Sequence, residues 1–584
     1  MVLPATPAGG PHVLEARTSS GRAQRIDNVL VGDVWLCAGQ SNMVLQVHRA
    51  LDSRAEIQNA KNDSIRMLTV PLASHPEPQA HFAKPVEWRR AAPESVPEFS
   101  ATCFYFAREL QKAVNVPMGL INAAWGGSKI ESWIGGPSLR EIEEYRPALE
   151  VLALYVDDPL AAHARWGERW EAWWRERVGA KSLPWAVEEQ GEWRDAPQGL
   201  GFWEQWGVPE LTQYTGMLWY RSTIELTRAQ AAQAATLSIG FVDEVDQTWV
   251  NGRPFGSLGK LARSERAKPA TGAGPERTYV LPSGALKTGK NVIVVNVLDT
   301  YATGGLHGPQ ESRALHFADG TSAPLAHWRY QLPPVAAGGP PRAPWEALAG
   351  LSVIHNAMIA PLESFGLRGV AWYQGESNTE EAHRYQQLLA ALMEDWRDRF
   401  GPELPFLIVQ LANYGPPPTA PGESGWAALR EAQRRAVARD AHAGLAVTID
   451  IGDRYDIHPA NKQEVGRRLA RAARRVAFGE ALAPSGAVPV AARREGDNIA
   501  VTFRDATGGL IAYGASGPIG FELCGAAPRS CRYVDARIDG ERVLLRTDDA
   551  LAVAKVRYCW ADSPVCTLYD GARLPAGPFE IEVQ

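Results

Sequence analysis

The sequence of 584 residues lacks the features that mark several large classes of protein. No stretch approaches the roughly 20 consecutive apolar residues of a membrane-spanning helix. No basic run is present, and the formal net charge of −6 argues against a nucleic-acid-binding surface. The chain also lacks a phosphate-binding loop, a dinucleotide-binding fingerprint and a metal-ligand spacing. We therefore expect no cofactor, no metal, no nucleic-acid partner and no membrane span.

Cysteine is scarce, with six residues in the whole chain. Two pairs repeat a seven-residue spacing: Cys524 with Cys531, and Cys559 with Cys566. These pairs predict loop-closing disulfides, although four cysteines allow three pairings, and disulfides would indicate an oxidising compartment such as the periplasm. A zinc site is the alternative, but no histidine lies near either pair. Cys37 and Cys103 lie in apolar surroundings and are expected to be buried free thiols.

No signal peptide is visible at the N-terminus, because Met1 to Pro7 has neither a basic start nor an apolar core. The chain is too long for one hydrophobic core, so three or four domains are expected. Tryptophan is abundant, with 20 residues. Exposed aromatic side chains can stack on sugar rings, but we expect most of these tryptophans in the core.

The chain is organised around Ser41. The apolar run from Val34 to Ala38 predicts a buried strand, which enters a turn at Gly39. A serine just past a strand end, beside a glycine, is a common way to display a nucleophilic hydroxyl, although an ordinary strand-to-loop turn gives the same pattern. Three later segments place small or polar residues directly after strand-like runs, where an open parallel sheet has its active site. They are Asn122–Trp133, Val370–Asn378 and Ile449–Pro459.

The motifs in these four segments resemble those of one enzyme superfamily. They are Gly39-Gln-Ser-Asn-Met43, Trp125-Gly-Gly-Ser-Lys-Ile-Glu-Ser-Trp133, Gln374-Gly-Glu-Ser-Asn378 and Asp456-Ile-His-Pro459. In this order they resemble the SGNH hydrolases, and specifically the sialate O-acetylesterase-like carbohydrate esterases, from about Gly9 to the C-terminus. The resemblance implies an α/β fold, with an SGNH-type parallel sheet flanked by helices, an inserted β jelly roll and a C-terminal β domain. It also implies a cofactor-free serine esterase that acts on O-acetylated glycans.

The pattern of strands and helices divides the chain accordingly. Helices and strands alternate from Val34 and again from Trp345, whereas short strands and an Asn251-Gly252 turn lie between them. The block between them resembles the galactose-binding-like jelly roll of glycoside hydrolases. The predicted domains are 1–33, the remnant of an N-terminal β domain; 34–180 and 341–482, the two parts of the catalytic domain; 181–340, the inserted jelly roll; and 483–584, a C-terminal β-sandwich.

The resemblance implies Ser41 as the nucleophile and His458 as the general base. The superfamily pattern has an aspartate three residues before the histidine, but Tyr455 occupies that position here. Asp456 or Asp453 could orient the ring instead, or a backbone carbonyl could do so in a Ser–His dyad. Asp450, at the end of a strand predicted over 446–451, is expected to be structural.

The oxyanion hole is expected to combine the Ser41 backbone N–H, the Gly127 N–H and the Gln374 side-chain amide, with Gly126 as the alternative glycine. The resemblance also makes Trp125, Trp372 and Asn42 candidate substrate contacts.

The motifs contain few cations that could bind a sugar carboxylate. Only Lys129 and Arg454 are available, whereas aromatic residues are abundant. We therefore expect an acetylated hemicellulose oligosaccharide, such as xyloglucan, as the substrate of a periplasmic or secreted esterase. A sialate 9-O-acetylesterase is the first alternative. A thioesterase or lipase-like hydrolase on the same fold and a non-catalytic glycan-binding protein are the others.

Overall fold

The computed structural model describes residues 4–179, 181–258, 276–547 and 552–584. Within these residues the chain forms two compact units. We call Met1–Leu72, Ala80–Ile130 and Met358–Gln584 the sheet unit, and Ala73–Gln79 with Glu131–Ala357 the insert unit. The part of the predicted catalytic segment 34–180 that follows Ile130 thus groups with the insert, and the C-terminal β region groups with the sheet. The four predicted boundaries between the five segments stay predictions.

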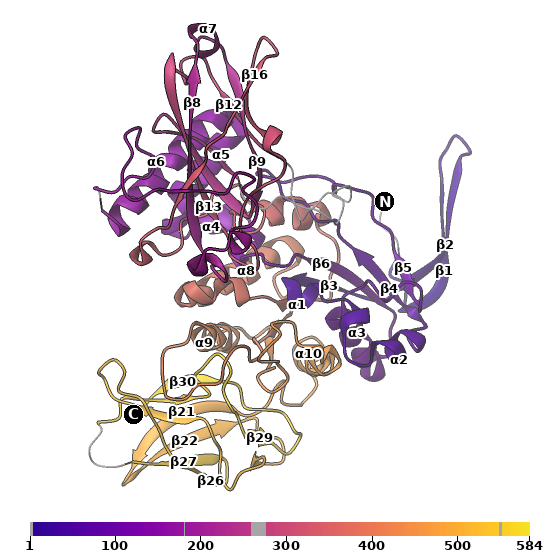
Figure 1. Ribbon diagram of the computed structural model, residues 1–584. Coiled ribbons are helices and arrows are strands. Elements are labelled where there is room, and N and C mark those ends of the chain that lie inside the picture. Colours follow the sequence, from indigo (N-terminus) through magenta and orange to yellow (C-terminus); the bar gives the residue numbers. More distant parts are fainter. Residues whose placement is uncertain (1–3, 180, 259–275, 548–551) are drawn as a thin grey trace. The chain divides into compact units, whose positions relative to one another are not determined.

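The sheet unit is built on one seven-stranded sheet, of which Figure 1 labels β3, β4, β5 and β6. Its order is β20-β19-β18-β3-β6-β4-β5, and the first six strands are parallel whereas β5 pairs antiparallel with β4. The side chains from Trp35 to Ala38 in β3 are fully buried, as expected for a strand covered on both faces. The predicted mixed α/β architecture is therefore confirmed. The strands are β3 (Asp33–Gly39), β4 (Asn62–Thr69), β5 (Arg89–Ala91), β6 (Met118–Ala124), β18 (Gly369–Tyr373), β19 (Phe406–Val409) and β20 (Ala443–Ala446).

Helices connect these strands. Ser100 and Asn461 cap two of them, because each side chain accepts a hydrogen bond from a first-turn backbone N–H. The helices are α1 (Ser41–Val44), α2 (Ser53–Gln58), α3 (Ala101–Val114), α8 (Ala382–Phe400), α9 (Gly425–Ala438) and α10 (Lys462–Val476). Among the described helices, none is both long enough and apolar enough to cross a membrane.

The predicted strand over 446–451 is wrong in position. Strand β20 ends at Ala446, and the residues after it form an irregular turn. Strand β20 can pair no further because its partner β19 ends at Val409, which is in register with Ala446. Beyond it, Asp450 makes an ion pair with Arg468 of α10, at 2.5 and 2.8 Å. The structural role predicted for Asp450 is consistent with this contact.

The prediction that Cys37 and Cys103 are free thiols is also wrong. The two form a disulfide that joins β3 to α3 across 66 residues of sequence. The predicted Cys524–Cys531 and Cys559–Cys566 disulfides are confirmed. Within the described part of the chain, Glu522 lies with Cys524 and Cys531 in the one group of side chains close enough together to hold a metal. The disulfide removes the thiolates that a metal would need.

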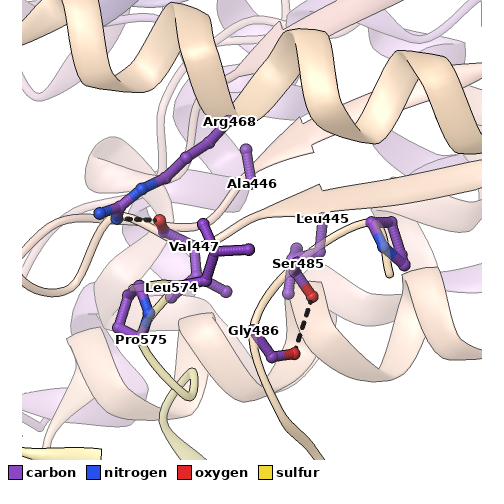
Figure 2. Close-up of a pocket in the computed structure, with 9 residues that line it drawn as sticks. Leu445, Ala446, Val447, Arg468, Ser485, Gly486, Leu574 and Pro575 are labelled. Carbon is purple, nitrogen blue, oxygen red and sulfur yellow. Dashed lines mark hydrogen bonds between the residues drawn. The ribbon is translucent and has the colours of Figure 1, made fainter. Parts of the chain in front are cut away.

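The C-terminal β region consists of small antiparallel sheets (Figure 1, orange to yellow). Figure 2 shows a pocket where this region meets the end of the parallel sheet, lined among others by Val447, Arg468 and Pro575. The predicted site residues do not line it. The strands are β21 (Val488–Glu495), β22 (Asn498–Arg504), β23 (Leu510–Ala512), β24 (Phe521–Cys524), β25 (Arg532–Tyr533), β26 (Ala536–Asp539), β27 (Arg542–Arg546), β28 (Lys555–Tyr558), β29 (Leu568–Asp570) and β30 (Phe579–Glu582). A separate N-terminal hairpin pairs β1 (Gly9–Arg17) with β2 (Ala23–Val31).

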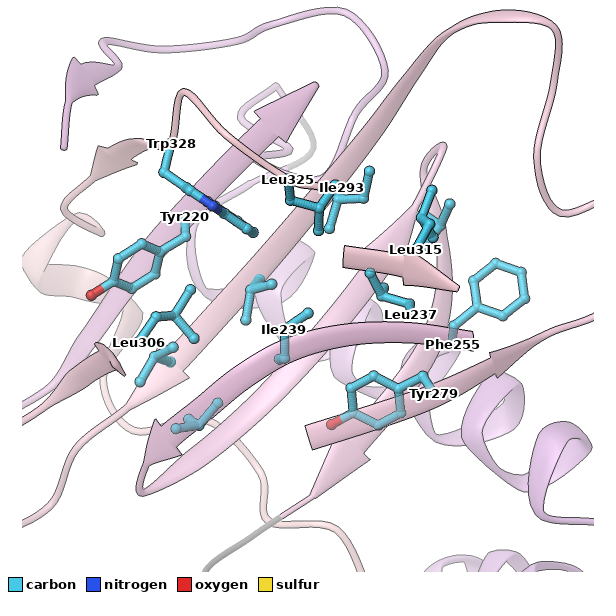
Figure 3. Packing of buried hydrophobic residues seen from close by; sticks show 14 of the residues in the cluster. Tyr220, Leu237, Ile239, Phe255, Tyr279, Ile293, Leu306, Leu315, Leu325 and Trp328 are labelled. Atoms are coloured by element: carbon cyan, nitrogen blue, oxygen red, sulfur yellow. The ribbon is translucent and has the colours of Figure 1, made fainter. Parts of the chain in front are cut away.

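The insert unit contains a six-stranded and a five-stranded antiparallel sheet. Residues from both sheets, including Tyr220, Ile239 and Leu315, pack into one apolar core (Figure 3). The Asn251-Gly252 turn joins β10 to β11 with positive φ at both residues, as a tight hairpin requires. The jelly-roll assignment stays a prediction.

The strands of the insert unit are β7 (Arg194–Asp195), β8 (Met217–Leu226), β9 (Ala235–Asp243), β10 (Val245–Val250), β11 (Arg253–Leu258), β12 (Arg277–Leu281), β13 (Gly289–Leu298), β14 (Gly305–His307), β15 (Arg313–Phe317), β16 (Ser322–Pro324) and β17 (Arg329–Gln331). Its α-helices are α4 (Gly136–Arg140), α5 (Arg146–Asp157), α6 (Pro159–Arg177) and α7 (Arg228–Ala231). Tryptophans of α6 pack against those of β8 and β10, and most tryptophans of the chain are buried, as predicted.

Candidate active site

Ser41 begins α1 directly beyond the end of β3. The neighbouring strands end at the same level, because Gly39 is in register with Ala124 of β6 and Tyr373 of β18. Gly39 has a φ of +136°, and a Cβ there would lie 2.1 Å from the Tyr373 carbonyl oxygen, so the turn requires glycine. The parallel sheet thus brings the first three predicted motifs to one edge.

Backbone hydrogen bonds hold these strand ends together. The Gln40 N–H donates to the Tyr373 carbonyl at 2.9 Å, and the Trp125 N–H donates to the Gly39 carbonyl at 2.9 Å. The Gln40 side-chain oxygen also accepts from the N–H groups of Gly375 and Ser377, both at 3.3 Å. The segment that carries Ser41 is therefore fixed from both sides.

Three backbone N–H groups near Ser41 are candidates for an oxyanion hole. A Cβ built on Gly126 would lie 3.3 Å from the Ser41 Cβ, so this glycine stands against the serine. Gly127 follows with a φ of +78°. Within the described part of the chain, the N–H groups of Ser41, Gly126 and Gly127 donate no hydrogen bond. They are free to stabilise a negative oxygen.

Gln374 is placed differently from the expectation. Its side chain is fully buried, and its amide donates to the Ser128 carbonyl at 3.0 Å and to Asn378 Oδ1 at 2.7 Å. Its Oε1 accepts from the Tyr385 hydroxyl at 2.7 Å. Both amide hydrogens are engaged within the protein, so this arrangement leaves none for an oxyanion.

His458 lies on the loop between β20 and α10. Asp456 Oδ1 lies 3.5 Å from His458 Nδ1, longer than a good hydrogen bond, and accepts the His458 backbone N–H at 2.8 Å. Asp453 instead accepts the Tyr455 backbone N–H at 2.8 Å. Of the two candidate acids, Asp456 is therefore the one that faces the imidazole.

The pKa of His458 is lowered from its ordinary value of 6.5. Burial is the largest cause, the charge of Asp456 raises the pKa, and the positive charges of Lys462 and Arg49 lower it. A lowered pKa keeps the imidazole neutral, as a general base requires.

Asn42 connects the two halves of the site. Its side-chain Nδ2 donates to the Ile457 carbonyl at 2.9 Å and to Glu376 Oε1 at 2.6 Å, and Lys462 Nζ donates to its Oδ1 at 2.6 Å. The residues beside Ser41 and His458 are therefore bonded to each other. Glu376 and Lys462 were not predicted, although Glu376 lies in the Gln374–Asn378 motif. The sequence carried no signal for Lys462.

The predicted sugar contacts are mostly inaccessible. Trp372 is fully buried and its Nε1 donates to the Tyr385 hydroxyl, so it cannot stack on a substrate in this structure. Asn42 is 2% exposed, and both of its amide hydrogens are engaged. Trp125 is 8% exposed, and its role stays a prediction.

A serine at the end of a central parallel strand, a histidine with a facing carboxylate and free backbone donors are the elements of a serine-hydrolase site. A sequence model of the family described as "Carbohydrate esterase, sialic acid-specific acetylesterase" matches residues 31–158 and 312–475, which are half of the chain. The chain belongs to this family of carbohydrate esterases.

Individual relatives agree with this placement. Human sialate O-acetylesterase is 35% identical over 150 residues, which cover 24% of this chain and only 29% of the human protein. The mouse sialate O-acetylesterase is 24% identical over an alignment that covers all of this chain and 84% of the mouse protein. The crystal structure of a carbohydrate acetylesterase from Xanthomonas citri is similar with a TM-score of 0.59 and 26% identity, covering 99% of this chain and 87% of that one.

Proposed function

We propose that this chain is a serine esterase that releases acetate from O-acetylated carbohydrates. In the first step Ser41 Oγ attacks the acetyl carbonyl while His458 takes its proton. The N–H groups of Ser41 and of Gly126 or Gly127 stabilise the tetrahedral oxyanion. His458 then protonates the departing sugar oxygen, which leaves an acetyl group on Ser41. A water molecule, activated by His458, cleaves this ester to acetate and restores Ser41.

One observation supports this proposal most strongly. Gly126 stands against Ser41, and the N–H groups of both residues donate no hydrogen bond within the described structure. Unpaired donors beside a strand-end serine have an obvious use in acyl transfer, and the family placement names the same chemistry. Asp456 is proposed to orient the His458 imidazole, since it is the carboxylate that faces it.

The test is acetate release from a panel of acetylated glycans by the parent and by Ser41→Ala. We expect the variant to lose about 10⁴-fold or more of the rate, because only the nucleophile is removed. Residual activity within tenfold of the parent would contradict the assignment. A p-nitrophenyl ester series tests the rival hydrolases, because a preference for long acyl chains would favour a lipase-like or thioesterase function. Glycan binding without any acetate release would favour the non-catalytic alternative.

For the substrate, we propose a neutral acetylated hemicellulose oligosaccharide. Lys129 and Arg454 were the predicted cations, and both have partners: Lys129 pairs with Glu381 at 2.8 Å, and Arg454 stacks on the Tyr455 ring at 4.4 Å. Neither is therefore available without rearrangement to bind a sugar carboxylate. Tyr455 is 79% exposed and offers an aromatic face three residues from His458.

A sialate substrate is the second candidate, and Arg49 favours it. This exposed residue ends the short turn η1 (Val47–Arg49), its charge acts on His458, and it makes no ion pair within the described residues. If 9-O-acetyl sialic acid is hydrolysed at least tenfold faster than acetylated xylo-oligosaccharides, and Arg49→Met removes that preference, the sialate is the substrate. Faster hydrolysis of the neutral oligosaccharides supports hemicellulose.

The three disulfides indicate an extracellular or secreted protein. A periplasmic location is part of the proposal. Detection of the mature chain in a periplasmic fraction would support it, and its retention in the cytoplasm with reduced cysteines would contradict it.

A further inference from the structure

A buried polar chain lies directly behind Ser41. Its centre is Asn42, whose side chain accepts from Lys462 and donates to Glu376 and to the Ile457 carbonyl. Lysine can only donate and a carbonyl can only accept, so the orientation of the Asn42 amide is fixed. The Asn42 side chain therefore connects α1 by hydrogen bonds to the loop of His458, to the first turn of α10 and to the segment after β18.

Lys462 occupies a costly position for a cation. Its side chain is fully buried, and it lies in the first turn of α10, where the helix dipole disfavours positive charge. Within the described structure it makes no direct ion pair, and its ammonium group lies 5.3 Å from the centre of the Tyr373 ring. Burial lowers its pKa to about 7, although the charges of Glu376 and Asp456 act in the opposite direction. A buried charge held by an amide rather than by a carboxylate needs a reason beyond packing.

Glu376 is the other end of this chain. Its Oε1 accepts from Asn42 at 2.6 Å, whereas its Oε2 is buried and has no hydrogen-bond partner within the described residues. Burial raises its pKa, against the effects of Asn42 and of the charge of Lys462. A buried carboxylate oxygen without a hydrogen-bond partner calls for an explanation, and this one belongs to a residue bonded to the neighbour of Ser41.

We propose that Lys462 and Glu376 are positioning residues that hold Ser41 and His458 in productive alignment through Asn42. This inference rests on the proposed esterase function, and it replaces the predicted substrate contact of Asn42 with a structural one. The charged groups acting on His458 are Asp456 from its own loop, Lys462 from α10 and Arg49 from η1. Removing the charge of Lys462 should therefore make His458 easier to protonate.

The test compares Lys462→Met, which keeps the length but removes the charge, with Lys462→Arg, which keeps the charge. For Lys462→Met we expect kcat to fall about 100-fold with little change in KM, because alignment rather than binding is lost. We also expect the midpoint of the acidic limb in its profile of kcat/KM against pH to shift to higher pH by about half a unit or more. Lys462→Arg should leave the limb in place, even if its larger side chain lowers kcat.

Two further measurements test whether Lys462 acts on His458 and through Asn42. An NMR titration of the His458 imidazole, with its signal assigned by comparison with His458→Gln, measures the shift in the His458 pKa directly. This measurement does not depend on acetate release, so it tests the inference even if the proposed esterase function is wrong. In kinetics, Lys462→Met with Glu376→Gln should be no worse than the poorer single variant, because both residues act through Asn42. If Lys462→Met lowers the melting temperature but leaves the His458 titration and the pH limb unchanged, Lys462 only supports the fold and the inference is wrong.

Discussion

Helix α10 buries two cations and surrounds them in opposite ways. Arg468 makes a two-pronged ion pair with Asp450, at 2.5 and 2.8 Å, and a further contact with Glu464 at 2.7 Å. Lys462, six residues earlier, makes no ion pair within the described residues, and it is linked to Glu376 through the Asn42 side chain. Burial alone would lower the pKa of Arg468, but the hydrogen bonds and charges of Asp450 and Glu464 outweigh it and raise the pKa. For Lys462 burial prevails, and the pKa falls to about 7.

From this difference we infer that Arg468 is a structural charge and Lys462 a functional one. A directly paired cation such as Arg468 has a fixed protonation state and joins α10 to the turn after β20. A cation that is buried without direct pairing, as Lys462 is, stays close to titration and affects the neighbouring histidine. Perturbed pKa values of this second kind collect at active sites. The comparison predicts that changes at Lys462 and its neighbours affect the reaction, whereas changes at Arg468 affect stability.

Removing the base should produce the largest effect. His458→Ala should lower acetate release about 10⁴-fold or more, because the serine then lacks a proton acceptor. The melting temperature should stay close to that of the parent, since the side chain is on a loop. Thermal unfolding and acetate release measure the two quantities, and a variant with more than a tenth of the parent activity would rule out His458 as the base.

Breaking the structural pair should affect stability instead. Arg468→Met leaves Asp450 without its partner and should lower the free energy of unfolding by about 3–5 kcal/mol. Denaturant unfolding measures this loss. The kcat/KM per folded molecule and the pH limb should be unchanged, and a shifted limb would show that the two cations of α10 do not differ in role. Arg468→Lys is the matched control, because lysine keeps the charge but cannot make the two-pronged ion pair.

Crowding the proposed oxyanion hole should have an intermediate effect. Gly126→Ala places a methyl group 3.3 Å from the Ser41 Cβ, so either the serine or the glycine N–H must move. We expect kcat to fall about 100-fold, comparable to the loss of one oxyanion donor. At the exposed Gly422 an added methyl group would meet no atom within 4 Å, so Gly422→Ala should be silent. Equal kinetics for the two variants would remove Gly126 from the site.

The smallest effect is a shift in pH dependence. Because the pKa of His458 is lowered from 6.5, its neutral form persists to lower pH, and the acidic limb of the parent kcat/KM should have its midpoint below pH 6.5. Asp456→Asn removes a negative charge that raises the pKa of His458. The acidic limb of this variant should therefore move to lower pH, whereas that of Lys462→Met should move to higher pH. A midpoint above pH 6.5 for the parent would contradict the lowered pKa of His458. A shift of both variants in the same direction would contradict the opposite effects of Asp456 and Lys462 on that pKa.

Much of this site could be predicted because strand ends and motifs are local signals. The apolar run before Ser41 predicted the strand that ends beside it, and the resemblance of the four motifs implied Ser41 as nucleophile and His458 as base. Residues whose roles depend on distant partners could not be assigned. Cys37 and Cys103 are 66 residues apart, and only the packing of α3 on β3 joins them. The apolar run over 369–373 predicted a buried strand, and Trp372 within it is fully buried, which conflicts with its expected role as a sugar contact.

The same limit applies to Gln374 and Lys462. The amide of Gln374 is suitable chemically for an oxyanion, but its hydrogens are used by Ser128 and Asn378. Lys462 resembles an ordinary charged residue at the start of an amphipathic helix, and only the tertiary structure buries it against Asn42.

Ser41, activated by His458, is the proposed nucleophile. The most direct measurement is covalent labelling with a fluorophosphonate, in which a serine oxygen displaces fluoride from phosphorus, followed by peptide mass spectrometry. We expect one adduct, on the peptide that contains Ser41, formed by the parent protein and absent from His458→Ala. An adduct on a different residue would contradict this assignment. Acetate release that continues after Ser41 has been labelled would also contradict it.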